Sequence, residues 1–260
     1  MPGIRLVVGL GNPGKEYERT RHNAGFWLVE RFASAKGLHF RKDPKYQALV
    51  ARLDGEGGNA GAWLLMPQSF MNASGRAVQM LAGFFKIKPE EILVVHDELD
   101  FPPGTARIKQ GGGIAGHNGL KDISQRLGSH DYWRLRLGVG KPPAGAEGAD
   151  YVLQKPPAEE RAAIDASIEA ALAVLPQCLA GDLQGAMQKL HTQDRPVVQP
   201  PKPVPEEKPK PRQERAQASP PKKEAPPKEA PAAKALEEDK AGFPKEPEKP
   251  GFLRSLFGKK

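Results

Sequence analysis

The stretch LVVGLGNPG, from Leu6 to Gly14, sets the first constraint on the fold. Its apolar start predicts a short buried strand, and Gly9, Gly11 and Gly14 have the G-x-G-x-x-G spacing found in many dinucleotide-binding folds. Such a fold needs its helix to begin within the glycines, so that backbone N–H groups meet the pyrophosphate. Here Pro13 removes one of those donors, and the charged segment KEYERTRHN delays the helix to about residue 23. The sequence therefore argues against a bound dinucleotide, and it indicates no other cofactor.

Outward from this strand, apolar runs of strand length recur at residues 4–10, 46–53, 62–67, 92–99, 105–110 and 133–140. Helical patterns lie at about residues 23–36, 72–85, 117–127, 158–174 and 182–190. The Gly-rich segment DGEGGNAG joins the second and third runs and predicts a hairpin. We expect an α/β fold, a single-domain three-layer αβα sandwich with a twisted mixed sheet, whose ligand lies where the strands end.

The 260-residue chain changes character near residue 195. Residues 195–260 hold 15 of the 27 prolines, 16 of the 39 Lys and Arg residues and 10 of the 31 acidic ones, and large apolar side chains are scarce before Phe252. Such a segment cannot bury enough apolar surface to offset the entropy of ordering it. We predict a globular domain over residues 1–194, a disordered linker over 195–250 and a short amphipathic segment over 251–260.

The charge of the predicted domain differs from that of the whole chain. Residues 1–194 hold 23 basic and 21 acidic residues, a net charge of +2, although the whole chain has a pI of about 9.5. A site for a polyanion must therefore be a local patch. Cys178 is the only cysteine, which excludes an internal disulfide and a cysteine metal cluster. No signal-peptide apolar region and no run of about 18 apolar residues is present, so we expect a cytoplasmic location.

Four segments carry a resemblance to a known family: VVGLGNPGKEYERTRHNAGF (7–26), MPQSFMNASG (66–75), VVHDELDFPPGTARIKQGGG (94–113) and GHNGLKDI (116–123). In this order they resemble the signature segments of bacterial-type peptidyl-tRNA hydrolase, and the resemblance spans about residues 4–190. That family cleaves the ester between a peptide and the terminal ribose of tRNA, and so recycles tRNA from abandoned translation. The resemblance implies a monomeric hydrolase whose catalytic domain is residues 1–194.

Ester hydrolysis needs a base for water, a group that orients the base, and donors for the developing oxyanion. His22 is the candidate base, because imidazole titrates near neutral pH. Asp97, at the end of an apolar run, is placed to accept from the other ring nitrogen and hold the tautomer. Taken alone, each is more often a surface histidine or a turn aspartate, but the resemblance matches both positions. It also places Asn12 nearest the scissile carbonyl.

Five further residues are expected to contact the substrate. Amide side chains can donate and accept hydrogen bonds without titrating, which suits Asn72 and Asn118, although both could instead cap helices. Tyr17 and Phe70 offer aromatic faces for ribose, adenine or peptide, and Met71 could pack against the histidine ring. By composition alone, Phe70 and Met71 are more often core residues, and the resemblance is what favours substrate contact.

The tRNA phosphates need cations near the cleft. Arg107 and Lys109 alternate along TARIKQ on one face of a predicted strand, and Arg134 and Arg136 do the same in WRLRLG. These side chains could form a local cationic patch or an ordinary solvated face. The resemblance favours Lys109 and Arg136, and Arg107 is the third candidate.

The loop GGGIAGHNG departs from the family pattern, which usually has glycine where Ala115 stands and a less bulky residue than Ile114. Because this loop should gate the cleft, its mobility is in question. His117 could line the site or cap a helix. With His22, His96 and Asp97 it could in principle bind a metal, but the spacing matches no compact ligand motif, so no metal is expected.

Beyond the spacer, Phe252, Leu253, Leu256 and Phe257 would share one side of a short helix flanked by cations. This segment could contact a ribosome, another protein or an anionic membrane surface, or be an inert end. A rival function for the whole chain is RNA binding without hydrolysis. A pure binder has no need for a base and its orienting carboxylate, so His22 and Asp97 favour the enzyme.

Overall fold

The computed structural model describes residues 2–55 and 61–193. Its centre is a seven-stranded sheet with the order β2-β3-β4-β1-β5-β7-β6. The strands are β1 (Leu6–Gly9), β2 (Arg41–Asp43), β3 (Ala48–Leu53), β4 (Ala62–Pro67), β5 (Ile92–Glu98), β6 (Ala106–Gln110) and β7 (Trp133–Gly138). The central strands β4, β1, β5 and β7 are parallel, whereas β2, β3 and β6 run antiparallel to their neighbours. The sheet is therefore mixed, as predicted.

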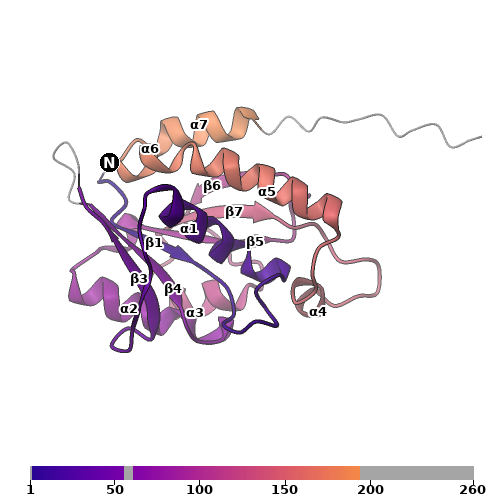
Figure 1. Cartoon of the computed structure of the whole chain (residues 1–260), viewed down its shortest axis with the longest axis horizontal. Coiled ribbons are helices and arrows are strands. Elements are labelled where there is room, and N and C mark those ends of the chain that lie inside the picture. Colours follow the sequence, from indigo (N-terminus) through magenta and orange to yellow (C-terminus); the bar gives the residue numbers. More distant parts are fainter. Residues whose placement is uncertain (1, 56–60, 194–260) are drawn as a thin grey trace, which may run out of the picture. The chain divides into compact units, whose positions relative to one another are not determined.

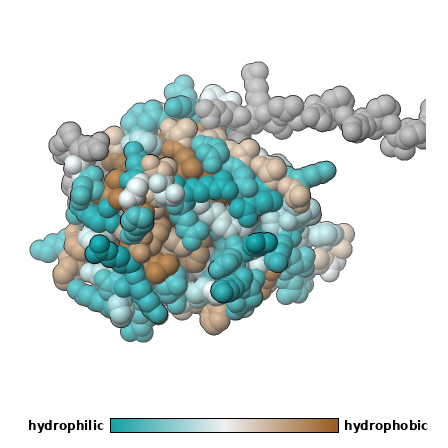
Figure 2. All heavy atoms as spheres, viewed as in Figure 1, coloured by the Kyte–Doolittle hydropathy of each residue, from teal (hydrophilic) through white to brown (hydrophobic). Residues whose placement is uncertain are grey.

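Helices cover both faces of the sheet (Figure 1). One layer holds α1 (Ala24–Ala35), α5 (Ala158–Leu172), α6 (Leu175–Leu179) and α7 (Leu183–Gln193), and the other holds α2 (Ser74–Phe84) and α3 (Asn118–Leu127). Alternate residues of each strand feed two apolar cores: Val7 packs on the first layer, and Leu6 and Val8 pack on the second. Outside these cores, hydrophilic residues cover much of the face in Figure 2 and hydrophobic ones form patches between them.

Glycines bring α1 directly against the sheet. A Cβ on Gly9 would stand 2.6 Å from the carbonyl oxygen of Gly25, and one on Gly25 would stand 2.4 Å from that of Val95. No real side chain tolerates such distances, so β1, α1 and β5 meet backbone to backbone. The glycines near the first strand thus serve close helix packing, and they place the start of α1 over the end of β5.

The structure agrees with the predicted elements to within a few residues at their ends. The hairpin prediction is confirmed by the antiparallel pairing of β3 and β4. Among the described strands and α-helices, three short ones were not predicted: β2, α6 and α4 (Gly148–Val152). They are three to five residues long, too short for a periodic pattern to emerge.

The predicted linker 195–250 and terminal segment 251–260 lie outside the described residues. Among the residues described, no helix is long and apolar enough to cross a membrane.

Candidate active site

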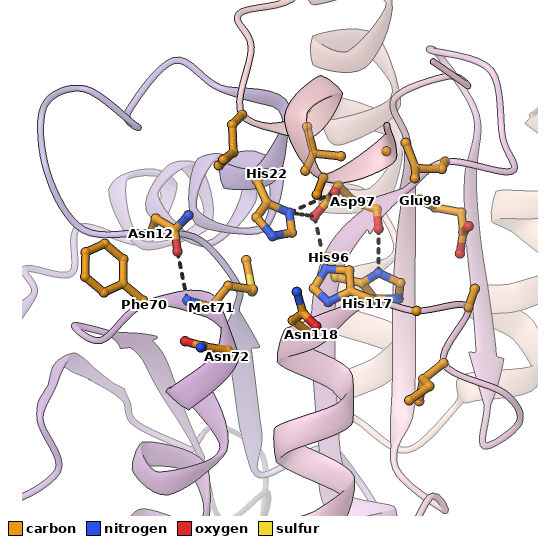
Figure 3. Close-up of a pocket in the computed structure, with 18 of the residues that line it drawn as sticks. Asn12, His22, Phe70, Met71, Asn72, His96, Asp97, Glu98, His117 and Asn118 are labelled. Atoms are coloured by element: carbon orange, nitrogen blue, oxygen red, sulfur yellow. Dashed lines mark hydrogen bonds and ion pairs between the residues drawn. The ribbon is translucent and has the colours of Figure 1, made fainter. Parts of the chain in front are cut away.

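A pocket of about 540 Å³ opens where β1, β4 and β5 end. Because these strands are parallel, the loops that follow them meet at one edge of the sheet. The first loop brings Asn12, the second brings residues 70–72, and β5 itself brings Asp97. Segments 114–118 and 148–153, around the start of α3 and along α4, complete the wall. Figure 3 shows these side chains converging from their separate elements.

His22 and Asp97 are in direct contact inside this pocket. The Nδ1 atom of His22 lies 2.9 Å and 3.0 Å from the two carboxylate oxygens of Asp97. Because a carboxylate only accepts, Nδ1 carries the proton and Nε2 presents a lone pair (Figure 3). Burial lowers the pKa of His22, but the charge of Asp97 and its hydrogen bond outweigh burial, so the net pKa is raised. This is the arrangement of a base with its orienting group.

A second histidine donates to the same carboxylate. His117 is the N-cap of α3: its Nδ1 accepts from the backbone N–H groups of Gly119 and Leu120 at 3.2 Å and 3.4 Å. Its proton must then lie on Nε2, which donates to Oδ1 of Asp97 at 3.1 Å. Burial would raise the pKa of Asp97, but the two imidazoles and their hydrogen bonds hold it well below its usual value. His117 thus both caps the helix and lines the site.

His96 forms the floor beneath these groups. It is fully buried, its Nδ1 donates to the backbone carbonyl of Asp97 at 2.7 Å, and its ring stands edge-on to that of His117. Burial, followed by the neighbouring His117 imidazole, lowers its pKa to about 3, so it stays neutral near pH 7.

His22, Asp97 and His117 are the side chains of this site that could be considered as metal ligands. Ligand atoms of His22, Asp97 and His117 lie within 4.8 Å of one another. However, a neutral imidazole has only one lone pair, and the helix N-terminus already uses that of His117. A metal would have to strip the proton from Nε2 or break the cap. Among the described residues, this site therefore fits two histidines hydrogen-bonded to Asp97 better than a metal centre.

Asn12 presents an amide N–H₂ to the pocket. Its Oδ1 accepts from the backbone N–H of Met71 at 2.8 Å, which orients Nδ2 away from Met71 and toward the cavity in Figure 3. Its backbone is held in turn by Asn23, which accepts from the N–H of Asn12 and donates to its carbonyl, both at 2.9 Å. Asn23 was not among the predicted site residues. In the sequence, only its position directly after His22 indicated that it could belong to the site.

The other predicted substrate contacts also line the pocket. Asn72 and Asn118 are exposed, and neither is the N-cap of the adjoining helix, because Ala73 and His117 occupy those positions. Met71 is buried with its sulfur against Gly119: a Cβ there would stand 2.6 Å from Sδ.

Two aromatic rings stand at the mouth of the pocket. Phe70 is 61 % exposed, and it meets Tyr17 edge to face with ring centroids 6.2 Å apart. The reading of Phe70 as a core residue is therefore wrong.

The four predicted cations share one face of the sheet edge. In the β6–β7 register, Arg107 lies opposite Arg136 and Lys109 lies opposite Arg134. Arg136 pairs with Glu98 at 2.9 Å, and Arg107 donates to the carbonyl of His191 at 3.0 Å.

The remaining two cations converge on the loop that leads to the pocket. Arg134 donates to the carbonyl of Gly113 at 2.6 Å. Both Arg134 Nη2 and Lys109 Nζ lie 3.0 Å from where a Cβ on Gly112 would stand. Two cations so close together favour an anion beside them.

The departures from the family pattern fall on the pocket wall. Ile114 lines the pocket and packs partly against the α2–α3 core, which ties the loop to the domain. Ala115 is exposed and has φ +46°, the left-handed region where glycine is favoured.

The chain is similar to known proteins in both sequence and structure. A sequence model of the family described as "Peptidyl-tRNA hydrolase" matches residues 6–197. The peptidyl-tRNA hydrolase of Leptothrix cholodnii is 51 % identical over 212 residues, 79 % of this chain and 99 % of that protein. That of Pseudomonas putida is 53 % identical over 194 residues, covering 74 % and 99 % of the two chains. The crystal structure of the Acinetobacter baumannii enzyme superposes with a TM-score of 0.69 at 42 % identity, covering 73 % of this chain and 95 % of its own. This chain therefore belongs to the peptidyl-tRNA hydrolase family.

Proposed function

We propose that the protein hydrolyses the ester bond between the peptide and the 3′-terminal ribose of peptidyl-tRNA, with a water molecule activated by His22. The contact between His22 and Asp97 at 2.9 Å carries the proposal, because it orients an unprotonated ring nitrogen into the pocket. The pocket at a strand-end edge and the relatives that carry this name support the substrate.

In the proposed first step, Nε2 of His22 takes a proton from water as the water oxygen bonds to the ester carbon. Asp97 stabilises the imidazolium that forms, since it already holds Nδ1. His117 keeps its Nε2 proton directed at Asp97. In the second step, the bond from carbon to ribose oxygen breaks and His22 returns its proton to that oxygen. The products are a peptide acid and free tRNA.

Asn12 stabilises the oxyanion between these steps. Its Nδ2 donor is fixed in place by Met71 and Asn23, so little reorganisation accompanies the reaction. We assign Asn72 and Asn118 to the peptide amides, Met71 to the pocket floor, and Tyr17 and Phe70 to the terminal nucleoside. Lys109 and Arg136, with Arg107 beside them, contact tRNA phosphates.

The test is release of an N-blocked aminoacyl group from tRNA, with and without EDTA. We expect release that is unaffected by EDTA and absent in His22→Ala. Binding of the substrate without release would instead favour the rival, a non-hydrolytic RNA-binding relative. Release that EDTA abolishes would refute the metal-free mechanism.

We also propose that residues 1–194 act as a monomeric catalytic domain in the cytoplasm and that residues 251–260 contact a ribosome, a protein or an anionic membrane. Deletion of residues 245–260 followed by co-sedimentation with ribosomes or vesicles tests the second idea. Unchanged partitioning would remove it, and unchanged hydrolysis would show that the reaction does not need residues 245–260.

A further inference from the structure

Four aromatic side chains gather where the end of α2 meets β3 and β4. We name Tyr46, Trp63, Phe84 and Phe85 the ring cluster. Trp63 stacks on Phe85 with ring centroids 4.5 Å apart, and Phe84 stands edge-on to Phe85 at 4.9 Å and to Tyr46 at 6.4 Å. No residue of the ring cluster lines the pocket described above. Phe84 is nevertheless 59 % exposed, and among the described residues only Phe70 and Leu153 are other exposed large apolar side chains.

Cations surround the ring cluster. The Nζ atom of Lys45 lies 3.4 Å from the ring centroid of Phe84, and the guanidinium of Arg52 lies 5.1 Å from that of Trp63. Arg5 donates to the backbone carbonyl of Phe85 at 3.3 Å, and Lys86 is exposed beside it.

Two carboxylates near these four cations have partners of their own. Asp43 accepts from the backbone N–H of Lys45, and Glu91 pairs with Arg5 at 3.5 Å. The exposed side of the ring cluster is therefore both aromatic and cationic.

The backbone at Lys86 adds an independent observation. Lys86 directly follows Phe85, the C-cap of α2, and has φ +51°, the left-handed position where glycine is most common. The N–H groups of Lys86 and Ile87 bond back to the carbonyls of Gly83 and Ala82, so the turn is well formed. A lysine here is less stable than a glycine. The positive φ disfavours lysine, whereas the helix dipole favours a cation at this end of α2. The exposed charge of Lys86 adds to the cations around the ring cluster.

Resting on the proposed function, we propose that the ring cluster, with Lys45 and Lys86, is a second RNA contact that holds the body of the tRNA. An unpaired base stacks on the open face of Phe84, and phosphates pair with the two lysines. An exposed ring among cations is the combination that binds single-stranded RNA without sequence preference. A membrane surface would instead need a broader apolar face.

The position in the sheet fits one polyanion that spans both cationic surfaces. Arg52 and Trp63 lie on the α2–α3 side of the sheet, as do Arg134 and Arg136. In the strand order, β3 and β7 are four positions apart, about 19 Å at the usual strand spacing. The pocket opens between them, at the ends of β4, β1 and β5. Along the strands, Trp63 lies at the start of β4 and Arg5 directly before β1, so the ring cluster stands at the edge of the sheet opposite the pocket. Bound tRNA would thus run from its reacting end in the pocket across the α2–α3 side of the sheet to the ring cluster.

The experiment measures binding of deacylated, full-length tRNA by fluorescence anisotropy over a range of KCl concentrations. We expect Phe84→Ser to weaken binding about fivefold to tenfold, because a stacked base is lost. Lys86→Gly should weaken binding and reduce the slope of log affinity against log salt by about 0.7 to 0.9, the value for one lost phosphate contact. The matched control is Lys36→Ser, an exposed lysine at the end of α1 in the other helix layer.

Lys86→Gly separates RNA binding from stability, since it relieves the left-handed strain and should not lower the Tm. Unchanged affinity in both variants would overturn the proposal. So would a loss confined to Phe84→Ser that follows a fall in its Tm. Hydrolysis of a minimal ester, a blocked amino acid on the 3′-terminal adenosine alone, should be equal in all four proteins. If the unmodified protein fails to cleave this ester, the proposed function fails, while the binding result still decides the RNA contact.

Discussion

Asp97→Asn tests the proposed mechanism most directly, because the structure dictates what the amide must do. Oδ1 of Asp97 accepts from both His117 Nε2 and His22 Nδ1, whereas Oδ2 faces His22 alone at 3.0 Å. The proton on His117 is fixed by the start of α3, so the asparagine oxygen must take the shared position. Its N–H₂ group then points at Nδ1 of His22 and favours the tautomer with the proton on Nε2. The nitrogen that faces the substrate would no longer be a base.

We expect kcat to fall by about 10⁴, the size of the tautomer effect when asparagine replaces the aspartate of a serine-protease triad. Single-turnover hydrolysis of N-blocked aminoacyl-tRNA measures the rate, and the ¹⁵N shifts of His22 report the tautomer. Asp100→Asn is the matched control, because this carboxylate lines the same pocket but is largely exposed and pairs with Lys141. A folded Asp97→Asn protein with kcat within tenfold of the unmodified enzyme would refute the reasoning.

Three further outcomes follow from the same geometry. A protonated His22 cannot take a proton, so kcat/KM should rise with pH as His22 loses its proton. Because Asp97 raises the pKa of His22, the midpoint of this rise should lie above pH 6.5. A midpoint below pH 6.5 would contradict a raised His22 pKa. Asn12→Ala should lower kcat by about 10² to 10³ with a small change in KM, as for loss of an oxyanion donor, and steady-state kinetics would show the opposite split if Asn12 only binds substrate. Ala115→Gly should raise the free energy of unfolding by about 0.5 to 1 kcal/mol in urea titration, because its φ of +46° disfavours alanine; equal or lower stability would show that the loop is not strained.

Local patterns in the sequence were enough for the fold class and for the longer elements. Strands such as Ile92–Glu98 are continuous apolar runs, and helices such as Ala24–Ala35 carry a clear apolar face, so burial alone selects them. The motif residues could also be assigned, because the family resemblance names His22, Asp97 and Asn12 one by one. The hydrophobic pattern did not predict the short elements β2, α4 and α6. Tertiary contacts stabilise these elements, and each has too few residues to show a hydrophobic period.

Only the tertiary structure decided how the site residues share their hydrogen bonds. The sequence left His117 as either a cap or a site residue, and it is both, because the start of α3 lies beside the end of β5. It also left the cations on TARIKQ and WRLRLG as two separate pairs; the antiparallel register joins them in one block. Sequence patterns record which side chains a segment exposes. Which tautomer a histidine adopts, and which distant carboxylate it meets, depends on partners that come together only when the sheet forms.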